Sequence, residues 1–216
     1  ESQRSVTPST MTMDQWLDYW MDIVIKPNRA ETTGYAYQKI IDNHLDPLLG
    51  AVPLSKLSPK QIQEYYQTMT RTEGLSSNTI RRHHDLLSAA LRMAVRQDML
   101  RVNPMERVEP PRPKLHEASY YTQENLKVLY QLVEGHWLEM VVKVTAGLGL
   151  RREEICGLRW ENVDLEAGLL SIREVRTEVG GSVVLKSPKT RTSARRLGIT
   201  GLQDLQQVLR RAWERR

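Results

Sequence analysis

Two arginines followed by two glutamates form the segment with the clearest chemical potential. Arg151 and Arg152 come directly after the glycine-containing residues 147–150, and Glu153 and Glu154 follow them. We expect one apolar helix to end at the glycines and a second helix to begin at the arginines. A guanidinium at a helix N-terminus lies at the positive end of the helix dipole, which is electrostatically unfavourable. A phosphate bound in a groove would offset this unfavourable energy. The alternative, an Arg–Glu pair on a solvated helix start, is the simpler interpretation of the spacing alone.

Basic and hydroxyl side chains gather in two further segments. The start of a predicted helix at residues 78–97 combines groups that suit phosphates and guanine edges, namely Ser77, Asn78, Thr79, Arg81 and Arg82. The serines and Asn78 are equally well explained as helix caps. The second cluster surrounds a predicted hairpin and contains Lys186, Arg191, Arg195 and Arg196. It is either a phosphate-facing surface or a solvated edge that prevents strand pairing.

Composition fits a nucleic-acid partner and excludes several classes of protein. The 216 residues carry a net charge of +5 with a pI near 9.4, which suits a polyanion without proving one. The single cysteine, Cys156, rules out a disulfide framework and a cysteine-based metal site, and it fits a reducing compartment. We find no apolar run long enough to span a membrane and no signal peptide. Because the chain starts with Glu1 rather than Met, we expect a trimmed or processed piece.

The spacing of apolar residues predicts a bundle of four helices in the first half of the chain. Residues 1–11 are polar and are expected to be disordered, and the helices are predicted at residues 12–25, at 32–44, from 59 onward and at 78–97. The segment Lys26-Pro27-Asn28 is expected to break the first helix, and the Pro47 segment to end the second. His83 and His84 are expected to be packing residues, because no carboxylate or thiol is spaced to complete a metal site.

A proline-rich stretch divides the chain. Pro104, Pro110, Pro111 and Pro113 lie among charged residues. They predict a semi-stiff linker at residues 106–118, between domains at 12–105 and 119–216. In the second domain, helices lead into the arginine segment and a final amphipathic helix closes the chain. Between the arginine segment and the final helix, apolar and polar residues alternate. This alternation predicts a single antiparallel sheet with strands at 168–175, 183–185 and 196–199. The predicted fold class is therefore mainly α with a small antiparallel sheet.

The segment from Gly149 to Asp164, with its Gly-Leu-Arg-Arg-x-Glu-Ile pattern, resembles the first catalytic box of the tyrosine recombinases, the phage-integrase family. The resemblance implies that Arg151 binds the scissile phosphate and that Glu154 orients Arg151. The family's core-binding, SAM-like domain is similar to four stretches of the first half, residues 37–50, 57–59, 75–80 and 89–104. The implied fold is a four-helix SAM-like bundle, a proline-rich linker and the N-terminal part of an α+β integrase catalytic domain.

The resemblance also implies a reaction and its partners. A tyrosine attacks a phosphate of double-stranded DNA and forms a 3′-phosphotyrosyl link, while arginines neutralise the developing charge without metal or cofactor. Lys189 is similar to the family's hairpin lysine, which protonates the leaving 5′-oxygen, and a positioned acid contributes on the order of a hundredfold or more. The alternative is a lysine in a solvated turn. The implied partners are duplex DNA and other protomers of the recombinase, in a bacterial or phage-encoded, nucleoid-associated protein of the cytoplasm that does not contact a membrane.

The sequence departs from the family in its later catalytic residues. Every histidine and every tyrosine precedes Arg151, so nothing matches the family's later histidines or its nucleophilic tyrosine. We therefore predict that this chain binds DNA, is monomeric in solution and does not cleave DNA by itself, while its parent protein carries out site-specific recombination. Two alternatives stay open: a non-catalytic DNA-binding module or regulator of the same fold, and an unrelated basic helical scaffold that binds protein.

Overall fold

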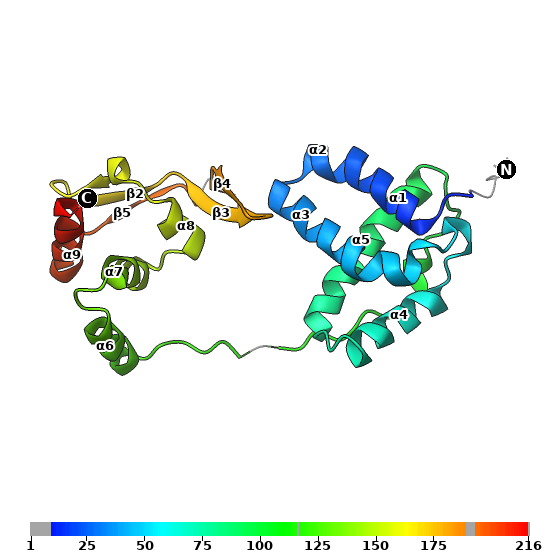
Figure 1. The fold of residues 1–216 in the computed structure, drawn as a ribbon, viewed down its shortest axis with the longest axis horizontal. Coiled ribbons are helices and arrows are strands. Elements are labelled where there is room, and N and C mark those ends of the chain that lie inside the picture. The colour runs from blue at the N-terminus through cyan, green and yellow to red at the C-terminus, as the bar shows by residue number, and fades with distance from the viewer. Residues whose placement is uncertain (1–9, 116, 189–192, 216) are drawn as a thin grey trace. The chain divides into compact units, whose positions relative to one another are not determined.

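The computed structural model describes residues 10–115, 117–188 and 193–215. The chain divides into two compact units, Glu1–Glu117 (unit 1) and Ala118–Arg216 (unit 2) (Figure 1). The described residues are mainly helical, with short antiparallel strands confined to unit 2, which confirms the predicted fold class. Among these residues, no helix is both long enough and apolar enough to cross a bilayer.

Unit 1 is a bundle in which two helices combine α-helical and π-helical turns. Its described elements, in chain order, are α1 (Met13–Trp20), η1 (Met21–Ile25), α2 (Lys26–Asn28), α3 (Glu31–Ile40), η2 (Ile41–Gly50), η3 (Leu54–Lys56), α4 (Pro59–Arg71), α5 (Ser77–Arg96) and η4 (Pro104–Arg107). Ser58 caps α4 as predicted, because its hydroxyl accepts the N–H of Gln61 at 3.3 Å. Ser76 caps α5 in the same way, accepting the N–H of Thr79 at 3.2 Å.

Two predicted helix ends are wrong because the backbone changes to π-helical turns near each proline. The segment Lys26–Asn28 continues the first helix as α2, and Pro47 lies inside the second helix, which runs on to Gly50. In a π-helix each N–H bonds to the carbonyl five residues earlier, as the N–H of Lys26 does to Met21. The wider turn accommodates the proline ring, which in an α-helix strikes the carbonyl of the preceding turn.

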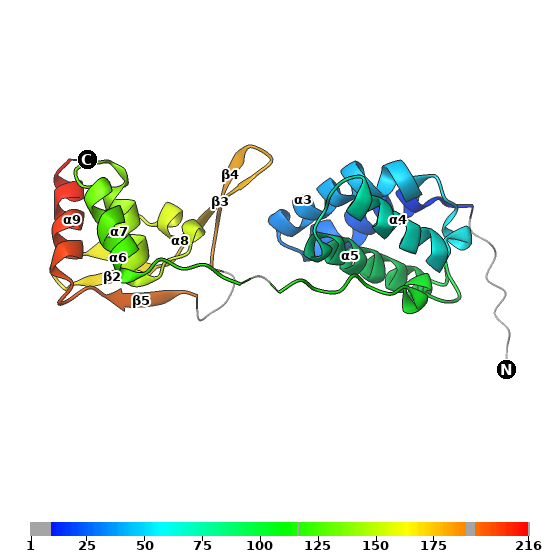
Figure 2. The ribbon, with the colours of Figure 1, turned by 90° about the horizontal axis from the view of Figure 1, so that it is seen from below.

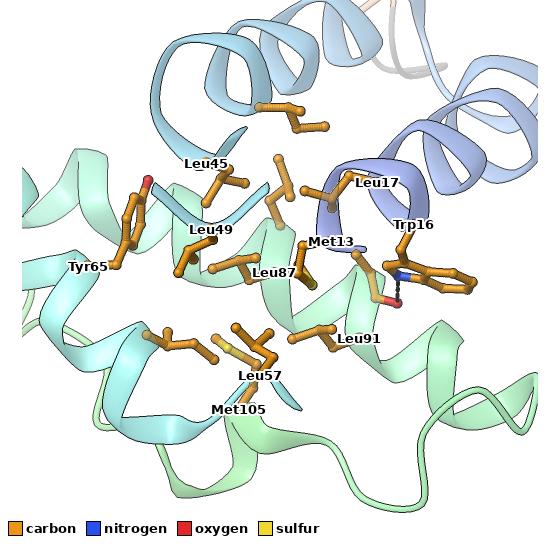
Figure 3. Packing of buried hydrophobic residues seen from close by; sticks show 14 of the residues in the cluster. Met13, Trp16, Leu17, Leu45, Leu49, Leu57, Tyr65, Leu87, Leu91 and Met105 are labelled. Atoms are coloured by element: carbon orange, nitrogen blue, oxygen red, sulfur yellow. Dashed lines mark hydrogen bonds between the residues drawn. The ribbon is translucent and has the colours of Figure 1, made fainter. Parts of the chain in front are cut away.

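One apolar core holds this bundle together (Figure 3). Its fully buried side chains come from α1, η2, α4 and α5 and include Trp16, Leu17, Leu45, Ile62, Leu87 and Leu91. The indole Nε1 of Trp16 donates a hydrogen bond to the carbonyl of Ala90 at 3.2 Å, so the polar atom of this ring is also satisfied. Met105 and Val108 are buried in the same core, so the first part of the proline-rich stretch packs as part of unit 1.

Unit 2 begins with helices that lead to the arginine segment. Its described helices are α6 (Gln123–Leu132), α7 (Leu138–Leu148), α8 (Arg152–Gly157), η5 (Trp160–Asn162) and α9 (Gln203–Glu214). Thr122 caps α6 in a capping box with Asn125. Gly149 ends α7 in the left-handed region at a φ of 62°, which glycine enters without steric cost. The predicted break between the apolar helix and the arginines is confirmed.

The strands of unit 2 form two small sheets. The strands are β1 (Val163–Asp164), β2 (Leu169–Ile172), β3 (Val175–Val179), β4 (Ser182–Lys186) and β5 (Arg195–Gly198). β2 is the centre of a three-stranded antiparallel sheet with β1 and β5 as its neighbours, whereas β3 and β4 pair only with each other. The β3–β4 hairpin projects away from the β2–β5 layer (Figure 2). Each of the three regions predicted as strands therefore contains a strand, but these strands do not belong to one sheet.

The prediction of a single sheet is wrong because the first strand is interrupted. Arg173 and Glu174 belong to no strand, and β3 begins after them in a different sheet. Here the chain passes directly against α8: a Cβ on Gly157 would lie 2.7 Å from the carbonyl oxygen of Glu174 and 2.8 Å from the Cα of Val175. Only a glycine permits this approach, and the contact holds β3 against α8 rather than in line with β2.

A second apolar core lies inside unit 2. It is formed by Val144, Leu150, Leu170, Ile172, Ile199, Leu205 and Leu209. Trp160 packs against this core, as predicted, and meets the ring of Trp213 edge to face with centroids 5.2 Å apart. The buried carboxylate of Glu139 ties α7 to α9, since its Oε1 accepts from Lys143 Nζ and from Arg211 Nη2, both at 2.8 Å.

Candidate functional site

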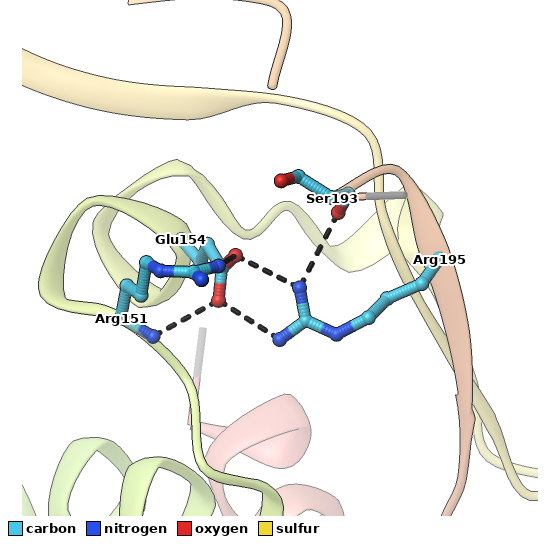
Figure 4. A network of polar contacts seen from close by, with 4 residues as sticks. All are labelled: Arg151, Glu154, Ser193 and Arg195. Carbon is cyan, nitrogen blue, oxygen red and sulfur yellow. Dashed lines mark hydrogen bonds and ion pairs between the residues drawn. The ribbon is translucent and has the colours of Figure 1, made fainter. Parts of the chain in front are cut away.

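Three charged side chains meet in one cluster of unit 2: Arg151, Glu154 and Arg195 (Figure 4). Arg151 directly precedes α8, Glu154 lies in its first turn, and Arg195 is the first residue of β5. The Arg151 side chain is 72% exposed, whereas the Glu154 side chain is 2% exposed. The Arg195 side chain is 27% exposed. The cluster therefore presents one guanidinium to solvent and buries the carboxylate that holds it.

Both oxygens of Glu154 accept hydrogen bonds from both arginines. Oε1 accepts from Nη1 of Arg151 at 3.0 Å and from Nη1 of Arg195 at 2.8 Å. Oε2 accepts from the backbone N–H of Arg151 at 2.9 Å and from Nη2 of Arg195 at 3.0 Å. The contact from Arg195 is bidentate, which is the strongest geometry between a guanidinium and a carboxylate.

These hydrogen bonds determine the charge state of the cluster. The hydrogen bonds from Arg195, followed by those from Arg151, lower the pKa of Glu154 to about 2, although burial acts in the opposite direction. The same contact with Glu154 raises the pKa of Arg195. At neutral pH all three groups are therefore charged, and two guanidiniums with one carboxylate sum to a net charge of +1.

The residues predicted around the hairpin have different outcomes. Lys186 ends β4, and Arg196 lies exposed beside Arg195 in β5. Lys189 and Arg191 lie outside the described residues, so their roles stay predictions. Sequence reasoning identifies Arg195 only as one member of a basic cluster and does not predict its contact with Glu154. Its contact with the carboxylate spans 41 residues, and no local pattern connects positions so far apart.

A groove of about 410 Å³ lies in unit 1 between the α3–η2 helix and the first turns of α5. Its polar lining includes Lys39, Asn43, Thr79 and Arg82. Thr79 and Arg82 are among the residues predicted to contact DNA. Lys39 and Asn43 belong to a different helix, and no local sequence pattern indicates that they share a groove with α5. The lining combines a cation from each helix and neutral polar groups with one carboxylate, that of Asp85, so the positive charges outnumber the negative charge. This balance suits an anionic ligand.

His83 and His84, which were predicted to be half-buried packing residues, contact tyrosines of α4. His83 is buried, and its Nδ1 lies 2.7 Å from the hydroxyl of Tyr65. Burial, and then the nearby His44, lower the pKa of His83 to about 4, so its ring is neutral at physiological pH. His84 is only half-buried, with Nδ1 3.0 Å from the hydroxyl of Tyr66. The part of the chain that the structure describes holds no group of three or more metal-ligating side chains.

Two other residues predicted to contact DNA hold the proline-rich segment. Nδ2 of Asn78 donates to the carbonyl of Lys114 at 2.9 Å, and its Oδ1 accepts the N–H of Lys114 at 3.1 Å. Nη1 of Arg81 donates to the carbonyl of Pro111 at 2.9 Å. The segment up to Lys114 is therefore fastened to the start of α5 by side chains that satisfy its backbone.

We expect the Asn78→Ala variant to expose this segment to protease. Without two hydrogen bonds of about 1 kcal/mol each, local opening costs less, and trypsin should cleave after Lys114 on the order of tenfold faster. Limited proteolysis followed by mass spectrometry measures this rate. Arg82→Ala is the matched control, because Arg82 lies exposed on the same helix turn and lines the groove instead. Equal cleavage rates in the two variants would show that Asn78 does not hold the segment.

Comparison with known proteins identifies relatives of both units. The family described as "Phage integrase, N-terminal SAM-like domain" matches residues 12–70. A tyrosine recombinase XerC-like protein of Caldanaerobacter subterraneus subsp. tengcongensis is 27% identical over 176 residues, covering 78% of this chain and 45% of the relative. The ICEBs1 integrase of Bacillus subtilis is 24% identical over 180 residues, covering 82% of this chain and 48% of the relative. The chain thus spans about half the length of these curated relatives.

Solved structures share the fold at low sequence identity. The Tn1549 transposon integrase in complex with a circular intermediate DNA has a TM-score of 0.80 at 20% identity, covering 95% of this chain and 66% of that chain. A lambda integrase tetramer bound to a Holliday junction has a TM-score of 0.65 at 19% identity, covering 82% of this chain and 51% of that chain. The shared fold is a SAM-like bundle followed by an α+β unit. The chain is therefore similar to tyrosine recombinases and phage integrases, and its residues 12–70 match the phage-integrase SAM-like domain.

Proposed function

We propose that this chain is the DNA-binding part of a tyrosine recombinase that integrates or excises a mobile element through a 3′-phosphotyrosyl intermediate. The observation that carries the proposal is the exposed guanidinium of Arg151, held by the buried carboxylate of Glu154. The names of the relatives support it, since they are a tyrosine recombinase and an integrase. Integrases of the same fold have been solved in complex with DNA.

Arg151 is the group that we propose binds the scissile phosphate. Of its five N–H donors, one on Nη1 binds Glu154, and the 72% exposure of the side chain leaves its outer edge accessible. The net charge of +1 of the cluster attracts a phosphodiester. A guanidinium that is already fixed can stabilise charge on the non-bridging oxygens as it develops, without reorganising during the reaction.

The remaining chemistry requires a general acid and a nucleophile. We assign the general acid to Lys189, which precedes Arg195 by six residues in the sequence and would protonate the leaving 5′-oxygen. No tyrosine or histidine of these 216 residues follows Arg151. We therefore propose that the parent protein supplies the nucleophile from outside these residues, and that the chain alone binds DNA without a covalent link.

In unit 1 the groove between α3–η2 and α5 is the proposed DNA contact. Lys39 and Arg82 supply positive charge from its two sides, and Asn43 and Thr79 supply neutral donors. Ser77 lies in the same first turn of α5. The proposed partners are double-stranded DNA and other protomers of the same recombinase, and the proposed location is the cytoplasm.

The competing hypothesis is a DNA-binding module that keeps this fold without the chemistry. The position of every histidine and tyrosine before Arg151 favours it. It predicts that Arg151 contributes no more to DNA affinity than any other exposed arginine. The recombinase proposal predicts a specific contact between Arg151 and a phosphate.

DNA affinity measured over a range of salt concentrations distinguishes the recombinase proposal from the non-catalytic DNA-binding module. The chain and its Arg151→Ala variant are titrated against a fluorescein-labelled DNA duplex by anisotropy. A lost phosphate contact should weaken binding and reduce the slope of log affinity against log salt by about 0.9. Arg210→Ala is the matched control, since it removes one exposed arginine from α9 of the same unit. If the two variants behave alike, Arg151 makes no phosphate contact and the recombinase proposal is wrong.

A further inference from the structure

The carboxylate of Glu154 is shared equally between two arginines. A carboxylate has about four acceptor positions, and four hydrogen bonds occupy them here, two from Arg151 and two from Arg195. Because the Glu154 side chain is only 2% exposed, water cannot replace a missing donor without local opening. Each arginine therefore depends on the other to keep this buried group satisfied.

The two arginines differ in how firmly the fold holds them. Arg195 begins β5, where it pairs with Ile172, a buried residue of the central strand. Its Nη1 also donates to the carbonyl of Ser193 at 3.3 Å (Figure 4). The guanidinium of Arg195 therefore also binds the backbone just before β5. Arg151 lies at a helix start with its side chain mostly exposed. Arg195 is therefore the anchored member of the cluster, and Arg151 is the accessible one.

Charge balance gives the second arginine a further effect. A guanidinium paired alone with a buried carboxylate forms a neutral pair, which attracts a phosphate weakly. A second guanidinium on the same carboxylate restores a net charge of +1 while the carboxylate still orients the first. The arrangement thus provides both orientation and attraction for an anion, which a single Arg–Glu pair cannot provide together.

We propose that Arg195 is a positioning residue for phosphate binding: it fixes the carboxylate of Glu154, so that the guanidinium of Arg151 stays oriented and the cluster stays positive. Arg195 acts through Glu154 and does not itself contact the DNA. The inference rests on the proposed function of Arg151 as the phosphate-binding group. Arg195 also connects β5, the strand that follows Lys189 in the sequence, to Arg151. Lys189 and Arg151 are the two residues proposed to act on the same phosphate.

A double-mutant cycle tests the coupling. The affinity of the chain for the labelled duplex is measured for Arg151→Ala, Arg195→Ala and the double variant. If Arg195 acts through the cluster, each single variant loses affinity on the order of tenfold, and the double variant loses clearly less than the product of the two single losses. Additive losses would mean that Arg195 contacts DNA independently, and no loss in Arg195→Ala would mean that it positions nothing. Either result overturns the inference.

A second measurement, made without DNA, separates this inference from the proposed function. Nuclear magnetic resonance of the Arg151 guanidinium reports its rotation, which the contact with Glu154 restricts in the unchanged chain. Arg195→Ala should free that rotation, and unchanged restriction would refute positioning. If Arg195→Ala frees the rotation but Arg151→Ala does not weaken DNA binding, the structural coupling holds and the proposed function is the part that fails.

Arg195→Lys keeps the experiment decisive if the alanine variant does not fold. Lysine keeps the positive charge but cannot form the planar two-bond contact with Glu154. We expect it to lose less DNA affinity than alanine while still freeing the rotation of Arg151. A lysine variant that binds DNA and restricts Arg151 as the unchanged chain does would show that the fork geometry of Arg195 is dispensable, which contradicts the inference.

Discussion

Glu154→Gln is expected to reduce the acid sensitivity of unit 2 and to destabilise that unit near neutral pH. Hydrogen bonds from the two arginines lower the pKa of Glu154 in the folded chain to about 2, from an ordinary value of 4.5. A carboxyl group with a lowered folded pKa stabilises the fold above its unfolded pKa and loses this contribution as pH falls through the folded pKa. The shift corresponds to about 3 kcal/mol, lost between about pH 4.5 and pH 2.

Urea unfolding at several pH values, followed by peptide-resolved hydrogen exchange, measures this effect in unit 2. The unchanged chain should lose stability over that interval, and Glu154→Gln should show a flatter profile from a lower value at pH 7. Glutamine keeps the shape of the side chain, but its amide offers one acceptor oxygen and opposes the remaining guanidinium donors with its own N–H groups. Glu166→Gln is the control, because it neutralises an exposed carboxylate of the same unit. Parallel pH profiles for the two variants would contradict the prediction.

Trp16→Ala is expected to unfold unit 1 at much lower denaturant while leaving unit 2 unchanged. The side chain is 1% exposed and belongs to the apolar core of unit 1 (Figure 3). Removing an indole from such a site leaves a cavity and typically costs about 3–5 kcal/mol. The change also removes the donor to the carbonyl of Ala90, which is then left without that partner. This loss is a large fraction of the stability of a domain of this size.

Peptide-resolved hydrogen exchange across a urea series can follow the two units separately. Tyr19→Ala is the matched control, since the Tyr19 ring lies 5.5 Å from that of Trp16 but is 39% exposed. It should cost about 1 kcal/mol or less. If Trp16→Ala lowered the stability of unit 2 by the same amount as that of unit 1, the two units would be one cooperative structure. The division at Glu117 would then have no energetic meaning.

Local signals in the sequence determined most of the helical framework and one half of the site. Ser58 caps a helix with proline at its first position, Thr122 caps a second, and Gly149 separates the apolar helix from the arginines. Glu154 was identified three residues after Arg151, and the two are in contact. Each of these features depends on atoms within about one helical turn, so residue type and spacing suffice to predict it.

Contacts between distant segments decided the rest. Three contacts join residues more than 20 positions apart: that of Glu154 with Arg195 in β5, the pairing of β2 with β5 rather than with β3, and the hold of Asn78 on Lys114. Any basic residue near the hairpin matches the local pattern equally well. Only the folded chain places one guanidinium, that of Arg195, within 3 Å of a buried carboxylate that must find donors.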